Sequence, residues 1–233
     1  MKKIIFTKIN PNVSDIYLPK QASKNLPKWY KELYSYFGTE NKKELDSTFQ
    51  NSGSIKRCVP VLDALSSGYI LPTYCDLWVR KDKDGQIFYA PSIQGSIEFH
   101  STLQAPNHPY MNEHPYPKWI NPWSIKTPKG YSTLFIPPVH GGNTFFKIVE
   151  GIVDTDKYTN PVNFPFVLND TNFEGLIPAG TPIVQIIPIK RDEWQMQIGN
   201  EEDIKNIRED HNTLKSLFFD GYKKMFWSKK VYK

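Results

Sequence analysis

The fold of this chain is decided by three segments: Gly151-Ile152-Val153-Asp154-Thr155-Asp156-Lys157-Tyr158, Phe166-Val167-Leu168-Asn169 and Pro178-Ala179-Gly180-Thr181-Pro182-Ile183-Val184-Gln185-Ile186-Ile187. In the first segment a glycine precedes a polar turn, and in the second a short apolar run ends at an asparagine. In the third, a turn leads into an apolar run, Pro182–Ile189, that is long enough to cross a core as a strand. This succession predicts a compact β unit.

The composition favours a packed, mainly β fold. Hydrophobic residues make up 39% of the 233 residues and aromatic residues 14%, which is ample material for an interior and excludes disorder of the whole chain. The chain contains 19 prolines, each of which fixes φ and removes a backbone hydrogen-bond donor. Such usage suits short strands, turns and extended arms, so an all-helical fold is disfavoured.

Charge and cysteine content limit the classes of partner. The net charge of +5 comes from 29 basic and 24 acidic residues that are interspersed, and only Lys223-Lys224 and Lys229-Lys230 make a locally basic end. A solvated tail is therefore favoured over nucleic-acid binding. Cys58 and Cys75 have no metal-ligand spacing, so we expect reduced thiols and no disulfide. No apolar run reaches the roughly 18 residues of a membrane span, so we expect no membrane association.

The pattern divides the chain into three parts. Residues 1–55 are expected to form an N-terminal arm, residues 56–198 a β domain, and residues 199–233 a helix with a basic tail. In the arm we expect a strand at Ile4–Ile9 and a short helix near Pro27–Tyr36, because proline is tolerated in a first helical turn. The polar stretch Gly38–Gly53 is expected to be a linker.

Short apolar runs divided by proline and glycine predict the strands of the β domain. The candidates are Tyr74–Val79, Ile87–Tyr89, Ser96–His100, Ser132–Ile136, Thr144–Ile148, Phe164–Leu168 and Pro182–Ile189. Such a series is typical of a barrel or sandwich. The interval Gln104–Trp123 is dense in proline and is expected to be an ordered loop without regular structure. Trp119, Trp123 and Trp194 are interpreted either as core residues or as part of a pocket or interface.

The clearest helix is expected from Glu201 to about Phe226. Its apolar residues alternate steps of three and four along one seam, made of Ile204, Ile207, His211, Leu214, Phe218, Gly221 and Met225. We expect this seam to pack on the core or on another subunit. His211 is then expected to be a buried, hydrogen-bonded histidine.

Two of the opening segments resemble the third and fourth motifs of the deoxyuridine triphosphatase and deoxycytidine triphosphate deaminase superfamily. The run from Gly151 to Tyr158 is similar to the motif Gly-(Val/Ile)-Ile-Asp-x-Asp-Tyr, with Lys157 inserted. The motif Gly-Asp-Arg-Ile-Ala-Gln-Leu-Ile is matched at Gly180, Ile183, Gln185 and Ile187. The resemblance implies a β-clip barrel of the dUTPase-like kind and a homotrimer.

The same resemblance assigns roles to residues. It implies that Asp154 takes the position of the carboxylate that orients water or the sugar, and that Tyr158 takes the position of the ring that packs on deoxyribose. The second motif of the superfamily holds phosphate with an Arg-Ser pair, and here Pro138-Val139 stands in its place. The Gly-rich, Arg-bearing C-terminal arm of the triphosphatases is also missing. Triphosphate hydrolysis by the usual mechanism is therefore disfavoured.

A second resemblance covers nearly the full length. The chain is similar to an uncharacterised protein family of tailed bacteriophages, through the segments Pro60–Ile70, Asn121–Pro128 and Phe226–Ser228. This resemblance implies a viral source, and with it a location in the host cytoplasm or in the virion. It implies no activity.

The candidate site residues are Asp154, Asp156, Tyr158, Gln185 and His140, of which Asp154 is the candidate catalytic residue. The two aspartates are interpreted either as an acid–base pair or as turn-stabilising residues. A metal site at His100, His108 and His140, with Asp76 or Cys75, is an alternative that the spacing does not support. Catalysis by a cysteine nucleophile is disfavoured because no activating base is marked. We expect no cofactor.

Three functions are compatible with these features. The first is a non-catalytic phage protein that binds or assembles through the scaffold as a virion component. The second is a protein that binds, hydrolyses or sequesters a nucleotide. The third is a protein that interacts with the host through exposed aromatic residues.

Overall fold

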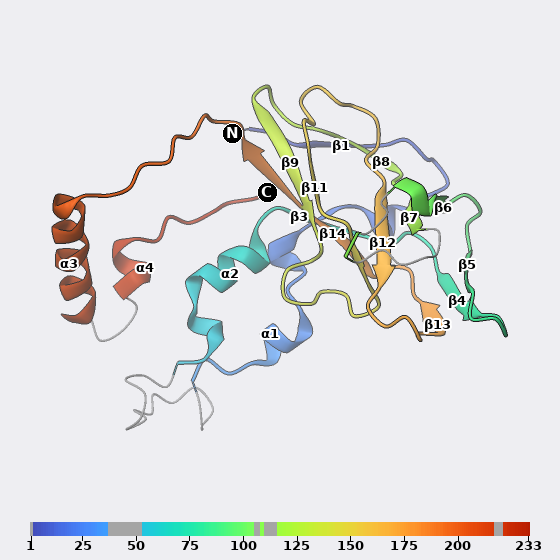
Figure 1. Ribbon diagram of the computed structural model, residues 1–233, viewed down its shortest axis with the longest axis horizontal. Helices are drawn as coiled ribbons and strands as arrows, with labels where there is room; N and C mark the ends of the chain where they lie inside the picture. The colour runs from blue at the N-terminus through green and yellow to red at the C-terminus, as the bar shows by residue number, and fades with distance from the viewer. Residues whose placement is uncertain (1, 37–52, 105–107, 110–115, 217–220) are drawn as a thin grey trace. The chain divides into compact units, whose positions relative to one another are not determined.

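The computed structural model describes residues 2–36, 53–104, 108–109, 116–216 and 221–233, and it is a mainly β structure with few helices (Figure 1). Neighbouring strands of the described sheets pair antiparallel. Antiparallel pairing allows the short connections that the many proline- and glycine-containing turns provide. The mainly β fold class expected from the composition is confirmed.

A five-stranded sheet contains the strands formed by the segments at Gly151 and at Pro182, whereas residues 166–168 lie in the four-stranded sheet. The strand order of the five-stranded sheet is β11 (Gly151–Val153), β9 (Tyr131–Ile136), β14 (Pro182–Lys190), β3 (Tyr69–Pro72) and β2 (Lys20–Gln21). The central strand β14 has neighbours on both sides. Ile183, Val184 and Ile186 are each exposed by 2% or less, which explains why β14 is a nearly continuous apolar run.

The remaining strands form three smaller sheets. A four-stranded sheet has the order β10 (Phe146–Ile148), β12 (Phe164–Leu168), β7 (Tyr116–Trp119) and β6 (Ile97–His100). A three-stranded sheet has the order β13 (Gly175–Ile177), β4 (Leu77–Lys81) and β5 (Ile87–Pro91). The strand β1 (Ile5–Lys8) pairs with β8 (Trp123–Lys126).

Aromatic residues on alternate positions of these strands form the core. Trp119 and Phe166 are fully buried, and their rings stack with centroids 5.8 Å apart. Phe146 lies 4.9 Å from Phe166 and 6.0 Å from Trp119, centroid to centroid. Trp123 is 3% exposed, so two of the three tryptophans with an open assignment are core residues. Trp194, at 90% exposure, is not.

The helical segments are short apart from one. They are α1 (Lys28–Glu32), α2 (Val59–Ser66), α3 (Glu201–Ser216) and α4 (Gly221–Met225), with 3-10 turns η1 (Asp15–Tyr17), η2 (Ala22–Lys24), η3 (Ile55–Arg57) and η4 (Thr102–Gln104). The Asn200 carboxamide oxygen accepts from the N–H groups of Glu202 and Asp203 and so caps the start of α3. No helix in the described part of the chain is long and apolar enough to cross a bilayer.

The chain forms two compact units. One contains Met1–Lys28, Leu65–Arg191 and Tyr232–Lys233, and the other contains Trp29–Ala64 and Asp192–Val231. The N-terminal residues belong to the first unit because β1 and β2 are hydrogen-bonded to strands of the sheets. Val13 and Ala22, which are 2% and 1% exposed, add side chains to its interior.

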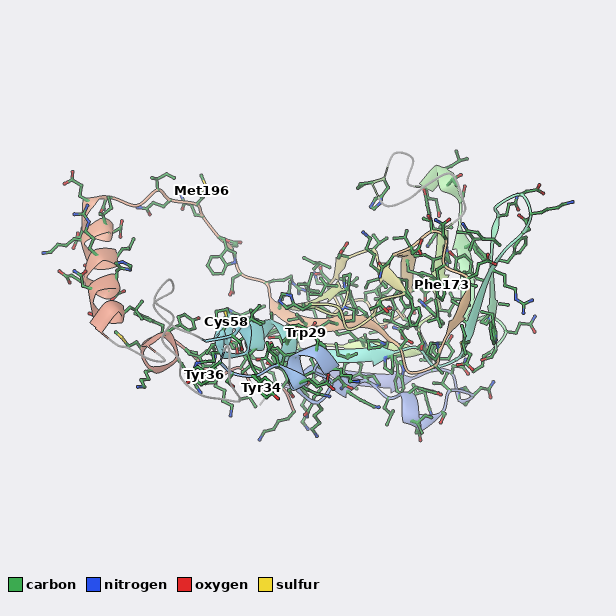
Figure 2. The ribbon with its side chains drawn as sticks, turned by 90° about the horizontal axis from the view of Figure 1, so that it is seen from below. Trp29, Tyr34, Tyr36, Cys58, Phe173 and Met196 are labelled. Carbon is green, nitrogen blue, oxygen red and sulfur yellow. The ribbon has the colours of Figure 1, made fainter. Side chains whose placement is uncertain are left out.

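Aromatic contacts organise the second unit around α1. Tyr30 is buried, its ring meets that of Trp29 edge-on at 5.5 Å, and its hydroxyl donates to the Lys56 carbonyl oxygen over 3.2 Å. The Arg57 guanidinium lies 4.7 Å from the centre of the Tyr36 ring, a cation–π contact. Figure 2 labels side chains of this unit, namely Trp29, Tyr34, Tyr36, Cys58 and Met196.

Two expectations about irregular and helical segments need correction. The interval Gln104–Trp123 contains a strand, β7, although no regular element was expected there. Pro117 is tolerated because it is paired only with Phe99 of β6, whereas the pairing with β12 is confined to Trp119 and Lys118. Pro117 has no backbone N–H, so it can donate no ladder hydrogen bond to a neighbouring strand. The helix expected at Pro27–Tyr36 is limited to α1.

In the part of the chain that the structure describes, the seam of the C-terminal helix is exposed at Ile204 and Ile207. Ile204 is 49% exposed and Ile207 66%, and His211 is exposed, so the expected burial of His211 is wrong. The seam residue Phe218 and nearly all of the expected linker Gly38–Gly53 lie outside the described residues.

Candidate functional site

The third-motif segment forms a strand followed by a tight turn. Strand β11 pairs with β9, and the chain then turns at Asp154, whose carbonyl oxygen accepts from the N–H groups of Lys157 and Tyr158 at 2.9 and 2.8 Å. The turn places Asp154 and Asp156 on one side, with Thr155 between them buried in the core. The Arg191 guanidinium contacts both carboxylates on this side.

Asp156 is fully engaged by its neighbours. Its side chain is only 3% exposed. The Arg191 guanidinium donates to both carboxylate oxygens, at 2.8 and 2.5 Å, and the Gly130 N–H donates to Oδ2 at 2.8 Å. The Arg191 hydrogen bonds, assisted by the Gly130 N–H, hold the pKa of this carboxyl far below its usual range. A bidentate pair of this kind is both strong and geometrically specific.

Asp154 contacts the same arginine, Arg191, from a more exposed position. Its Oδ1 accepts from the Ser132 hydroxyl at 2.6 Å and lies 3.1 Å from Arg191 Nη1. The Ser132 hydrogen bond, followed by the charges of Arg191 and Lys157, lowers the pKa of the Asp154 carboxyl. Unlike Asp156, the Asp154 side chain is 49% exposed. We refer to Asp154, Asp156, Arg191, Ser132 and Gly130 as the carboxylate–arginine cluster.

Arg191, Ser132 and Gly130 are the members of this cluster that were not among the candidate site residues, and Arg191 is the charged one. It follows the last residue of β14, Lys190, which pairs with Tyr131 of β9. This register brings Arg191 beside the Gly130 turn, where its N–H donates to the Gly130 carbonyl oxygen at 2.9 Å. An arginine at the end of a strand is a weak signal, because the register of a distant strand decides what it meets.

A chain of buried hydroxyls lies under the cluster. Thr127 Oγ1 is 3.0 Å from the Tyr131 carbonyl oxygen and 2.8 Å from Thr155 Oγ1, which is 2.7 Å from Thr133 Oγ1. A carbonyl can only accept, so Thr127 donates to it, Thr155 donates to Thr127, and Thr133 donates to Thr155. All three threonines are exposed by 3% or less, and the chain fixes the turn to the sheet.

The other candidate residues lie elsewhere. Gln185 is 1% exposed, and its carboxamide joins two segments: Oε1 accepts from the Val139 N–H at 3.1 Å and Nε2 donates to the Ser67 carbonyl oxygen at 2.7 Å. On β9, the partner of Gln185 is Ile136, four residues from Ser132, or about 13 Å along the strand. Gln185 is thus placed as a buried brace away from the carboxylate–arginine cluster.

Tyr158 and His140 are surface residues. Tyr158 is 46% exposed and lies at the end of the Asp154 turn. His140 is exposed and has a φ of 55°, the left-handed region that is uncommon for residues other than glycine. It belongs to the turn after Pro138-Val139, on the Gln185 side of the sheet. The structure therefore joins Asp154 with Asp156, and separately joins Gln185 with the segment before His140.

The residues considered for metal binding are dispersed. Within the described ranges, no group of three His, Cys, Asp or Glu side chains is placed to hold a metal ion. His100 Nδ1 lies 2.5 Å from Gln104 Oε1, and Asp76 Oδ1 accepts from the Ala179 N–H at 2.7 Å. Burial raises the pKa of the Cys75 thiol, which keeps it in the protonated, weakly nucleophilic form.

The cluster predicts a specific response to acid. Asp156 has a lowered pKa in the folded state, so its contribution to stability is complete above the pKa of about 4 in the unfolded chain and is lost as the pH falls below it. We expect Asp156→Asn to lower the Tm at pH 7 by about 4–10 °C. Between about pH 6 and pH 3 the variant should lose less Tm than the wild type does.

Thermal unfolding followed by circular dichroism over this pH range measures the effect. Asp84→Asn is the matched control, because Asp84 is an exposed carboxylate in the turn between β4 and β5. It should reproduce the acid profile of the wild type. If Asp156→Asn and the wild type lost Tm in parallel on acidification, the lowered pKa of Asp156 would be refuted.

No protein-family model matches this sequence, and no curated protein matches it.

Proposed function

We propose that this chain is a phage-encoded, non-catalytic β-clip protein that acts as a binding or assembly component of the virion. The observation that carries the proposal is the state of Asp156. Asp156 is 3% exposed and bound at both oxygens by Arg191, and the same guanidinium lies 3.1 Å from Oδ1 of Asp154, the carboxylate to which the resemblance gives the water- or sugar-orienting position. That Oδ1 also accepts from the Ser132 hydroxyl, so both carboxylates are used in holding the turn. The Arg191–Asp156 hydrogen bonds hold the turn to the end of β14.

The electrostatics of the cluster also oppose phosphate binding. Two carboxylates share the Arg191 guanidinium, so its charge is already paired within the cluster and is not left over for a triphosphate. Where the superfamily places Arg-Ser, this chain has Pro138-Val139, and the Val139 N–H is bonded to Gln185. Pro138 and Val139 supply no guanidinium and no hydroxyl to clamp a phosphate.

Assembly through exposed apolar residues is part of the proposal. Ile204 and Ile207 lie one turn apart on α3 and are largely exposed. In the segment before α3, Trp194, Met196 and Ile198 are 90%, 87% and 81% exposed, and Figure 2 shows Met196 projecting from this segment. Exposed apolar residues that gather over a few turns of chain are typical of interaction surfaces. We propose a homotrimer with these residues at or near its contacts.

Two measurements on the full chain test the proposed function. Mass spectrometry of purified virions of the encoding phage should find the protein at a fixed copy number, and light scattering should give the mass of a trimer in solution. Chromatographic assays with dUTP, dCTP and other deoxynucleotides should show no turnover, and about 1 mM of each should leave the Tm unchanged. Nucleotide turnover that disappears in Asp154→Asn would overturn the proposal and favour the nucleotide enzyme instead.

A further inference from the structure

A pocket of about 300 Å³ lies in the first unit, apart from the carboxylate–arginine cluster. It is formed where the N-terminal segment, with η1 and β2, meets the ends of β3 and β14. The residues that line it are Ile16, Tyr17, Lys20, Asn25, Ile70, Pro72, Gly180 and Pro182. This volume is at the lower end of the range for small-molecule sites, which suits a ligand of one ring with a substituent.

The pairing of two prolines explains why the pocket forms here. In the β14–β3 ladder Pro182 pairs with Pro72, and the register shifts between Pro182 and Val184. Since neither proline has an N–H, neither can donate a ladder hydrogen bond at this pair. The sheet is therefore irregular at this end, and flat pyrrolidine rings take the place of a regular strand pair.

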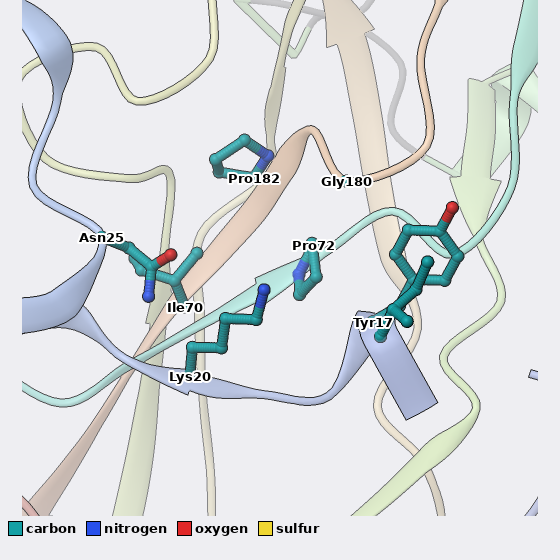
Figure 3. A pocket seen from close by; sticks show the side chains of 8 residues that line it. Tyr17, Lys20, Asn25, Ile70, Pro72, Gly180 and Pro182 are labelled. Carbon is teal, nitrogen blue, oxygen red and sulfur yellow. The ribbon is translucent and has the colours of Figure 1, made fainter. Parts of the chain in front are cut away.

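One side of the pocket is lined by apolar side chains, and the other side is lined by polar ones. The Tyr17 ring contributes an aromatic surface beside Gly180, and Ile70 contributes an aliphatic one. Figure 3 shows Lys20 reaching from β2 toward Pro72, with Asn25 to one side and Tyr17 to the other. The Asn25 Nδ2 group donates to the Gln21 carbonyl oxygen at 2.9 Å, which holds the carboxamide in place.

Lys20 supplies the charge of this pocket. Its backbone pairs with Ile70, which fixes where the side chain starts. Within the described ranges, the ammonium group has no hydrogen bond and no ion pair to a protein side chain. The pocket thus combines flat apolar walls with one cation and a nearby amide.

We propose that this pocket binds a small aromatic carboxylate, with its ring against Pro72, Pro182 and Tyr17 and its carboxylate on the Lys20 ammonium. Flat rings pack well on proline and tyrosine faces. One ammonium matches the single charge of a carboxylate, whereas phosphate sites use arginine forks or several convergent backbone N–H groups. The pocket contains neither arginine nor such a row. This binding activity goes beyond the proposed assembly role.

The probe for the test is 4-hydroxyphenylacetate, with its neutral amide, 4-hydroxyphenylacetamide, as the uncharged counterpart. We expect the acid to bind the full chain with a Kd of about 1 mM, measured by NMR titration, with cross-relaxation to the Tyr17 ring. The Lys20→Gln variant should bind about 10-fold more weakly or not at all, because a charged hydrogen bond is lost. Lys24→Gln, which changes an exposed lysine in the neighbouring η2 turn, should bind like the wild type.

Each other outcome overturns the proposal. No binding of the acid by the folded wild type removes the site. Equal affinity for the acid and the amide, or equal binding by Lys20→Gln and Lys24→Gln, removes the role of the ammonium group. Circular dichroism of both variants confirms that they are folded. The result is independent of virion incorporation, so failure here and failure of the proposed function are distinguishable.

Discussion

The Gly68→Ala variant should fail to accumulate as a folded protein, or should unfold at a Tm about 10–20 °C below that of the wild type. Gly68 joins α2 to β3 with a φ of +71°, which an L side chain adopts only with strain. An alanine Cβ would also lie 2.0 Å from the Ile186 carbonyl oxygen and 2.9 Å from its carbonyl carbon. Both atoms are backbone of the central strand β14, so the clash can be relieved only by separating β3 from β14.

A series of three glycine variants separates the strain of a positive φ from the clash of the new Cβ with β14. Gly151→Ala has neither a positive φ nor an atom within 4 Å of the new Cβ, and we expect a Tm within about 2 °C of the wild type. Gly130→Ala has a φ of +84° but open space, so we expect a loss of about 1–2 kcal/mol from strain alone. If the Tm of Gly68→Ala lies far below the Tm of both other variants, the clash with β14 is the main cause of its loss of stability. A Gly68→Ala protein as stable as Gly130→Ala would contradict this explanation.

The strands that could be predicted from the sequence are those whose own residues show a local apolar pattern. Strand β12 has the expected bounds, Phe164–Leu168, and β14 differs by one residue from Pro182–Ile189. Both are buried on alternate or consecutive positions, which produces a local apolar pattern. Boundaries at β4 and β10 shifted by two or three residues, because turns and strand ends share the same residue types.

Strands defined by a distant partner were missed. Strand β2 has only two residues, Lys20 and Gln21, and exists because β3 lies beside it. Strand β7 contains Pro117, which argues against a strand until the partial pairing with β12 is known. Pairing between residues far apart in sequence leaves no periodic signal in either segment. Nothing in the local sequence could therefore have predicted these strands.

The candidate site shows the same division. The resemblance pointed to Asp154 and Asp156, and they do lie together, but the partner that determines their state, Arg191, is brought to them by strand register. Of the two interpretations offered for the aspartates, turn stabilisation is the one that these hydrogen bonds favour. Gln185 occupies the expected position of the fourth motif in the sequence, but its side chain is not at the candidate site. Instead it is buried and hydrogen-bonded to the backbone of Ser67 and Val139.

The second large effect is expected in the aromatic core. Phe166 is fully buried on β12 and contacts rings from three other strands: Trp119 of β7 at 5.8 Å, Phe146 of β10 at 4.9 Å and Tyr89 of β5 at 5.7 Å. The first two belong to the same sheet as Phe166, and Tyr89 belongs to the three-stranded sheet. Tyr89 is partly buried, and this burial raises its pKa to about 12. One side chain thus joins two sheets.

Phe166→Ala should destabilise the protein by about 3–5 kcal/mol, because it removes the buried ring and leaves a cavity that several rigid aromatic neighbours cannot close. Thermal unfolding should show a Tm lower by roughly 6–20 °C. Urea unfolding should show a lower midpoint concentration. Phe166→Leu keeps much of the volume and should lose less than half as much. The control is Phe88→Ala on β5, whose side chain is 54% exposed and should change stability by no more than about 0.5 kcal/mol. Equal losses at Phe166 and Phe88 would refute the assignment of Phe166 to the junction of the two sheets.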